Sequence, residues 1–285
     1  MRHIAVALAA FGVVVGVVRV SARGDEASPA VKDELAKFQG TWQLVAAEKD
    51  GERTPEERTR PIRVTITGNT HTVRFGDQVV AHDVSFAIDP AKRPRQVTDT
   101  INTGESKGKQ ILGIYRLEGD TLVSCVAPIG SPDRPTTFAA GAGSGHTLRV
   151  FRRVREIGDA KKAAIEAELK RFEGSWRFVS MEYAGKTMSE ESLRGERLIL
   201  KEDRFTQKTG GASIAGVFSV DPSVKPKTID ITITGGPAVG VLIQGIYELE
   251  GDVYKVCSGL PGKPRPTSFA SSAGNGLSVL AREKP

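Results

Sequence analysis

The stretch Gly40-Thr41-Trp42-Gln43-Leu44-Val45 decides the fold, because one periodicity ends there and another begins. Just before it, Val31, Leu35 and Phe38 have the spacing i, i+4, i+7, which places them on one apolar stripe of a short helix. The Gly-x-Trp segment that follows is typical of a strand start. The sequence therefore predicts a helix that runs directly into the first strand of a sheet.

The same arrangement returns 134 positions later, where Ile165, Leu169 and Phe172 precede Gly174-Ser175-Trp176-Arg177-Phe178-Val179. Two copies of one fold are therefore predicted, at residues 30–155 and 161–285. Because the junction near residues 155–160 is short, we expect the two domains to be close neighbours. Further matches follow in the same order in both halves: Asp89-Pro90 and Asp221-Pro222, Gly113-Ile114-Tyr115 and Gly245-Ile246-Tyr247, Leu117-Glu118-Gly119-Asp120 and Leu249-Glu250-Gly251-Asp252, and Arg134-Pro135-Thr136 and Arg265-Pro266-Thr267.

Alternation of apolar and polar residues dominates each half. Ile62, Val64 and Ile66 share one face of a predicted strand, and the polar residues between them share the other. Strands in the first half are predicted to begin near residues 41, 62, 70, 79, 95, 109, 120 and 147. A short helix followed by eight antiparallel strands predicts an all-β fold of two tandem eight-stranded barrels, since closure removes the sheet edges.

The first residues do not belong to either barrel. A basic start is followed by an uncharged apolar run from Ile4 to Val18, and Arg19 closes that run before it reaches the roughly 20 residues that a membrane span needs. Residues 1–22 are therefore predicted to be a signal peptide cleaved after Ala22. The mature protein is expected to be exported, periplasmic or secreted, with no transmembrane segment.

Composition and charge exclude several classes of protein. The 285 residues are 39% hydrophobic and 26% charged, as in globular domains. Residues 30–155 carry 19 Lys and Arg against 15 Asp and Glu, and residues 161–285 carry 18 against 15, so no concentrated basic stripe suggests a nucleic-acid partner. Cys125 and Cys257 occupy equivalent places in the two halves and are interpreted as buried free thiols, with a bridge between the halves as the alternative.

These motifs together resemble an uncharacterised, lipocalin-like repeat domain that is expanded in planctomycete bacteria. The resemblance covers nearly the whole mature chain, twice, and implies the fold rather than an activity. In lipocalins the Gly-x-Trp tryptophan packs across the closed end of the barrel under an arginine from near the last strand. The resemblance therefore implies a structural stack of Arg153 on Trp42 and of Arg282 on Trp176.

No catalytic or cofactor motif is present in the sequence, so we expect a non-enzymatic binding module without a cofactor. Small eight-stranded barrels are either hollow or filled. If they are hollow, each barrel is expected to hold a small apolar or amphipathic molecule. If they are filled, the alternative is a structural or protein-interaction module of the cell envelope; the sequence identifies no protein partner. Six residues are predicted to contact a ligand: Tyr115, Tyr247, Phe86, Phe218, Arg134 and Arg265, with loop-fixing hydrogen bonds as the alternative for the two arginines.

One difference between the halves points to chemistry in the first barrel. His71, His82 and Asp99 fall on the inner face where the second copy has apolar residues, namely Phe205, Ile214 and Ile231. A hairpin at Gly76-Asp77 is expected to place His71 directly opposite His82, with Asp99 nearby. Two imidazoles and a carboxylate are a metal-binding set, so metal-dependent activity of the first barrel is a further alternative to a hydrated polar interior. The first barrel is therefore expected to be the more polar inside.

Signal-peptide cleavage gives the first testable prediction. N-terminal sequencing of protein recovered from outside the cytoplasm should begin within a few residues of Arg23. An intact Met1 on membrane-bound material would instead show an uncleaved anchor.

Overall fold

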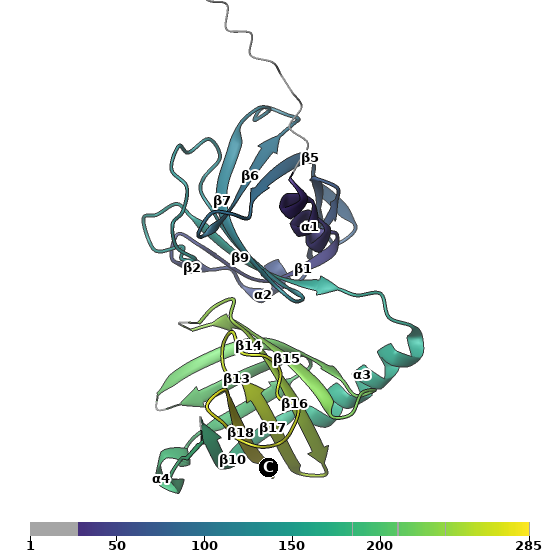
Figure 1. Ribbon diagram of the computed structural model, residues 1–285, viewed down its shortest axis with the longest axis vertical. Helices are drawn as coiled ribbons and strands as arrows, with labels where there is room; N and C mark the ends of the chain where they lie inside the picture. Colours follow the sequence, from purple (N-terminus) through teal and green to yellow (C-terminus); the bar gives the residue numbers. More distant parts are fainter. Residues whose placement is uncertain (1–27, 184, 210, 237, 285) are drawn as a thin grey trace, which may run out of the picture.

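The chain forms two β-barrels stacked along the long axis of the molecule (Figure 1). The computed structural model describes residues 28–284, apart from residues 184, 210 and 237 and the side chain of His82. The predicted signal peptide and its cleavage site thus lie outside the described residues. No helix among the residues described is long and apolar enough to cross a lipid bilayer.

Each barrel is one antiparallel sheet of eight long strands that closes on itself. In the first barrel β1 pairs with both β3 and β9, and in the second β10 pairs with both β12 and β18. The first barrel contains α1 (Pro29–Phe38), β1 (Gly40–Lys49), β2 (Glu52–Arg53), α2 (Glu56–Thr59), β3 (Ile62–Thr67), β4 (Thr70–Phe75), β5 (Gln78–Asp89), β6 (Arg95–Ile101), β7 (Gln110–Glu118), β8 (Thr121–Val126) and β9 (Thr147–Val154).

The second barrel repeats this order element by element. It contains α3 (Asp159–Phe172), β10 (Gly174–Tyr183), β11 (Lys186–Thr187), α4 (Glu190–Leu193), β12 (Arg197–Lys201), β13 (Arg204–Thr209), β14 (Ala212–Asp221), β15 (Lys227–Gly235), β16 (Leu242–Glu250), β17 (Val253–Gly259) and β18 (Asn275–Arg282). The predicted tandem eight-stranded barrels, each behind a short helix, are therefore confirmed. The sequence analysis did not predict the two-residue strands β2 and β11 or the one-turn helices α2 and α4.

One end of each barrel is held by a clamp of tryptophan, arginine and helix carbonyls. In the first barrel Arg153 Cζ lies 4.1 Å from the ring centroid of Trp42, which is fully buried. The Arg153 guanidinium donates to the carbonyls of Lys37 and Gln39, and Trp42 Nε1 donates to Phe38 O at 2.7 Å. The last carbonyls of a helix have no intrahelical donor, so these bonds join α1 to both strands that close the barrel.

The second barrel contains the same clamp. Arg282 Cζ lies 4.2 Å from the centroid of Trp176, and its guanidinium donates to the carbonyls of Arg171 and Glu173. Trp176 Nε1 donates to Phe172 O at 2.8 Å. Both stacks are the ones that the resemblance to lipocalins implies.

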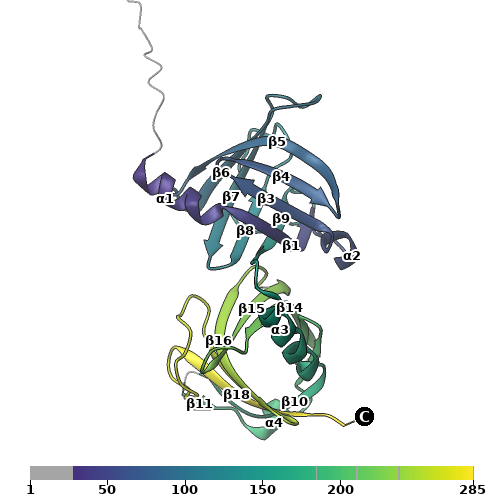
Figure 2. The ribbon, with the colours of Figure 1, turned by 90° about the vertical axis from the view of Figure 1, so that its right-hand side faces the viewer.

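The barrels contact each other through an apolar patch. Outward-facing residues of β1, β7, β8 and β9 form a buried cluster with Val217 of β14 and Val239 of the β15–β16 loop. The cluster from the first barrel includes Val45, Ala46, Ile114, Val123, Cys125, Leu148 and Val150. The predicted close neighbourhood of the two domains is confirmed, and Figure 2 shows the first barrel stacked on the second.

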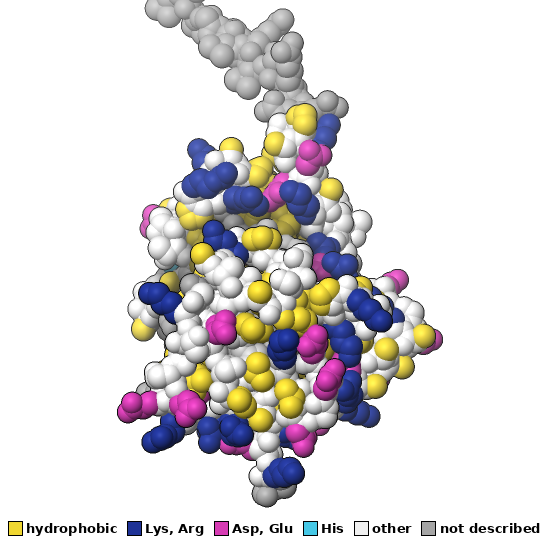
Figure 3. All heavy atoms as spheres, turned by 60° about the horizontal axis from the view of Figure 1, so that its bottom comes forward, with side chains coloured by type: hydrophobic (Ala, Val, Ile, Leu, Met, Phe, Trp, Pro, Cys, Tyr) yellow, Lys and Arg dark blue, Asp and Glu magenta, His cyan; other side chains and the backbone are white. Residues whose placement is uncertain are grey.

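Arginines of the first barrel surround this patch and bond to the second barrel. Arg152 pairs with Asp203 at 2.6 Å, and Arg60 pairs with Glu202 at 2.5 Å. Arg116 Nη2 donates to Gly240 O at 2.8 Å. One ion pair runs the other way, from Arg204 of the second barrel to Glu56 of the first at 2.5 Å. On the lower face of the molecule charges of both signs are interspersed instead (Figure 3).

The clamp leads to a stability prediction. Trp42→Ala and Trp176→Ala should each lower the free energy of unfolding by roughly 3–5 kcal/mol, because each removes a fully buried aromatic side chain. Chemical denaturation measures the loss, with the exposed Val80→Ala as control. Unchanged unfolding of both tryptophan variants would show that the tryptophans do not hold the barrel ends together.

Candidate functional site

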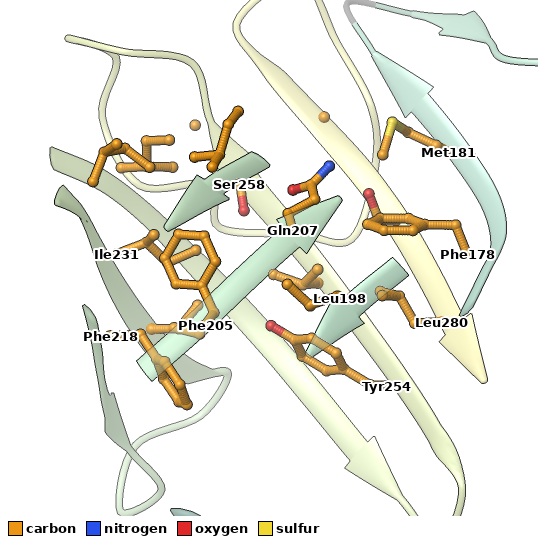
Figure 4. Close-up of a pocket in the computed structure, with 18 of the residues that line it drawn as sticks. Phe178, Met181, Leu198, Phe205, Gln207, Phe218, Ile231, Tyr254, Ser258 and Leu280 are labelled. Atoms are coloured by element: carbon orange, nitrogen blue, oxygen red, sulfur yellow. The ribbon is translucent and has the colours of Figure 1, made fainter. Parts of the chain in front are cut away.

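The second barrel encloses an apolar cavity of about 280 Å³ (Figure 4). Inward side chains from most strands line it, including Phe178, Leu198, Phe205, Ile231 and Leu280. Tyr183, Leu260 and Pro261 also contribute to its wall, and Tyr183 is exposed to solvent. Apart from the tyrosines, no titratable side chain lines this cavity among the residues described.

Few polar groups face this cavity. Gln207, Ser258 and Ser278 line its wall, and the buried Tyr254 points its hydroxyl inward (Figure 4). The ring of Tyr254 is held edge-on against Phe172 and Trp176 at the clamped end, with centroids 5.0 and 5.8 Å away. Burial raises the pKa of Tyr254, so the phenol stays protonated and remains a donor. The first barrel has Leu122 at this position.

The first barrel holds a smaller cavity of about 80 Å³ with different chemistry. Besides Tyr115, its polar lining residues are His71, Asp99, Ser124 and Arg149. Equivalent positions of the second barrel, matched by strand pairing, hold Phe205, Ile231, Val256 and Ser278. The expectation of a more polar first barrel is confirmed.

The polar groups of the first cavity affect one another's protonation. Burial lowers the pKa of His71 and raises the pKa of Asp99, although the opposite charges of the two groups act against these shifts. Burial also lowers the pKa of Arg149, yet an arginine stays protonated in a protein. The neutral forms of His71 and Asp99 are therefore favoured beside a permanent positive charge.

The predicted pairing of His71 with His82 is wrong. His71 pairs with Val84, because the β4–β5 ladder shifts register twice between His71 and Arg74. A bulge inserts an extra residue and re-aims the strand, and Asp83 accordingly has a φ of 54°. The side chain of His82 lies outside the described residues, and no described group of three or more His, Cys, Asp and Glu could hold a metal ion.

Tyr115 and Tyr247, predicted ligand contacts, are engaged by helix carboxylates. Tyr247 donates to Glu168 of α3 at 3.0 Å, and Tyr115 donates to Glu34 of α1 at 3.4 Å. Tyr115 lines the first cavity, whereas Tyr247 does not line the second. The other two predicted aromatic contacts line the cavities: Phe86 the first and Phe218 the second.

The structure does not bring Arg134 or Arg265 to either cavity. Arg134 donates to the carbonyls of Val97 and Gly113, and Arg265 donates to Ile229 O at 2.9 Å and to Gly245 O at 2.6 Å. These bonds match the loop-fixing alternative. Cys125 and Cys257 are buried free thiols, as interpreted from the sequence, and burial raises the pKa of both.

Sequence reasoning missed two pairs of residues. Arg149 and Tyr254 could have been found by overlaying the halves, since Ser278 and Leu122 stand in their places. Glu34 and Glu168 lie on the helices beside the apolar stripes. The helices were predicted from the apolar stripes alone. Neither carboxylate carries a sequence signal for burial, because its partners come from distant strands.

Comparison with known proteins does not identify a function. A solved structure of a protein of unknown function from the DUF3598 family of Nostoc punctiforme is similar over 87% of this chain and 97% of its own length, with 9% identity and a TM-score of 0.23. No protein-family model and no curated protein sequence matches the chain. The function is therefore argued from the cavities.

The buried carboxylate of α3 generates a pH prediction. Burial alone would raise the pKa of Glu168, but hydrogen bonds from Lys227 and Tyr247 outweigh it, and the pKa lies below its ordinary value of 4.5. A lowered folded pKa gives stability that is present above about pH 4.5 and lost as the pH falls through the folded value. Glu168→Gln should flatten the acid limb of the stability curve.

Thermal melts between pH 3 and pH 7 measure this effect, and the exposed Glu166→Gln on the same helix is the control. An acid limb unchanged in Glu168→Gln would contradict the assignment.

Proposed function

We propose that the protein is an exported, lipocalin-like, non-enzymatic binding module whose second barrel holds a small, neutral, mainly apolar molecule. The observation that carries this proposal is the apolar cavity of about 280 Å³ in a barrel that is otherwise densely packed. Small-molecule sites are typically concave, largely apolar and about 300–1,000 Å³ in volume. The cavity lies just below that range, which favours a ligand smaller than a typical drug.

The lining restricts the charge of the ligand. Moving an ionised group into an apolar site without a partner costs several kcal/mol or more, and no Lys, Arg, His, Asp or Glu lines this cavity among the described residues. A carboxylate or an ammonium group would therefore have no counter-ion there. The proposal is accordingly limited to neutral molecules.

Tyr254 adds one polar requirement. Its hydroxyl faces the cavity as a donor near the clamped end, while the residues around it are hydrophobic. A ligand with one carbonyl or hydroxyl oxygen at its inner end would accept this bond. The loss of such a bond costs about 0.5–1.5 kcal/mol, or roughly 2- to 10-fold in affinity.

The proposal includes export because the N-terminal apolar run contains no charged residue, as is typical of a signal peptide. The alternative of a structural envelope module without a small ligand gives a different experimental outcome. If no small molecule binds the second barrel, that alternative replaces the binding proposal.

A matched pair of probes tests the proposal. Calorimetric titration of the full chain should show that 1-indanone binds more tightly than indane, its hydrocarbon counterpart. Tyr254→Phe should remove most of this difference while leaving indane binding unchanged, since only the hydroxyl is lost.

A cavity-filling variant provides the second arm. Ser278→Phe should abolish binding of both probes, and the barrel should accept the larger side chain because the first barrel has Arg149 at this position. The exposed outer-face change Val179→Ala is the control. Binding by Ser278→Phe equal to that of the unmodified protein would place the ligand outside this cavity.

A further inference from the structure

We propose that the first barrel has a second, independent binding site, in which Arg149 binds the carboxylate of a small organic acid. This site differs from the apolar cavity of the second barrel in residues, size and charge. It goes beyond the proposed function, and either site could exist without the other.

Arg149 lies on the inner face of β9. It pairs across the sheet with Ser124 of β8, and both side chains line the first cavity. Its neighbours Leu148 and Val150 point outward into the interface between the barrels. Strand alternation therefore fixes the guanidinium inside the barrel.

The guanidinium has no protein partner within the described part of the chain. Arg149 Nε is buried and donates to no acceptor there, and its side chain forms no ion pair or hydrogen bond with the described residues. Three other arginines of this barrel, Arg134, Arg152 and Arg153, each donate to at least two acceptors. Arg149 as a whole is partly exposed, so its guanidinium borders the cavity while its Nε is shielded from solvent. A cation in such a position is normally paired, because its hydration is reduced.

Three titratable groups surround Arg149. Asp99 and His71 face it from β6 and β4, and Tyr115 faces the cavity from β7. Burial raises the pKa of Asp99 and of Tyr115 and lowers that of His71, while the charge of Arg149 acts to lower the pKa of Asp99. Arg149 is the one arginine or lysine on this cavity wall among the described residues, and its permanent positive charge suits an anion and disfavours a metal ion.

The geometry favours a short carboxylic acid over other anions. An arginine fork matches the two oxygens of a carboxylate, and the rest of the wall is apolar, with Phe86, Leu122 and Phe151. A volume of about 80 Å³ leaves room for only a short alkyl chain beyond the carboxylate. Phosphate carries more charge and more acceptor oxygens than this wall can satisfy.

The second barrel serves as a natural control for the site. Ser278, Val256 and Ile231 replace Arg149, Ser124 and Asp99 there, and the barrel closes in the same way. The charged residue is therefore not needed for the fold. Arg149→Ser, which copies the second barrel, should remain folded and melt at the same temperature or higher without added acid, because it removes a buried unpaired charge.

The test is calorimetric titration of the full chain with acetate, propionate and butyrate, with inorganic phosphate as the competing anion. The unmodified protein should bind at least one of the three acids, and Arg149→Ser should weaken that binding at least tenfold. Asp99→Asn should bind as well or better, since it cannot become negative. The exposed Arg177→Ser should bind like the unmodified protein.

Three results would overturn the proposal. They are equal carboxylate binding by Arg149→Ser, a clear drop in its melting temperature without added acid, and phosphate binding as tight as that of the best carboxylate. Binding of 1-indanone in the second barrel should be unchanged in Arg149→Ser, so failure of this site and failure of the proposed function are distinguishable.

Discussion

The stack of one arginine on one tryptophan is the interaction on which each barrel depends. Trp42 lies directly opposite Arg153 in the β1–β9 ladder, where the sheet closes. The same arginine satisfies the terminal carbonyls of α1, whose partial negative charge favours a cation. Asp120 pairs with it at 3.2 Å from the β7–β8 turn. The helix, the first strand and the last strand thus contact one side chain, so the same arginine helps to close the sheet and to cover its end.

The two barrels meet through unlike surfaces. A head-to-tail interface extends into a filament if each unit carries both surfaces. Each barrel also has a free surface that is equivalent to the interface surface of the other barrel, and residues of both free surfaces differ from those of the interface. On the first barrel Ser85 and Gln110 replace the apolar Val217 and Leu242 of the second. Four arginines of the first barrel bond across the interface, and three of them are replaced in the second barrel: Arg53 by Thr187, Arg116 by Glu248 and Arg152 by Ala281. The fourth, Arg60, is matched by Arg194. The free counterpart of the interface on each barrel therefore differs from the surface that forms it.

Much of the fold was predictable from sequence, because two copies report the same constraints. The contacts of Trp42 with Arg153 and of Trp176 with Arg282, which help to close the barrels, involve residues repeated in register. The cavities were less predictable. A bulge at Asp83 shifts His71 away from its expected partner without a glycine to signal it. The arginines of β9 look alike in sequence, yet Arg149 enters the cavity, Arg152 crosses to the other barrel and Arg153 stacks on tryptophan. Strand alternation separates Arg152 from the other two, and position along β9 separates Arg149 from Arg153.

The comparison of the two interiors separates what the fold requires from what a ligand requires. Residues of the clamp are the same in both barrels, and so are the helix carboxylates that bond Tyr115 and Tyr247. Inside the barrels, the residues that differ lie on the cavity walls: Arg149 against Ser278, Asp99 against Ile231 and Leu122 against Tyr254. Natural proteins depart from well-satisfied packing mainly at functional sites. Arg149 Nε has no hydrogen-bond partner among the described residues, and the second barrel forms the same fold with Ser278 in its place. The charge is therefore best explained by a molecule that the barrel binds.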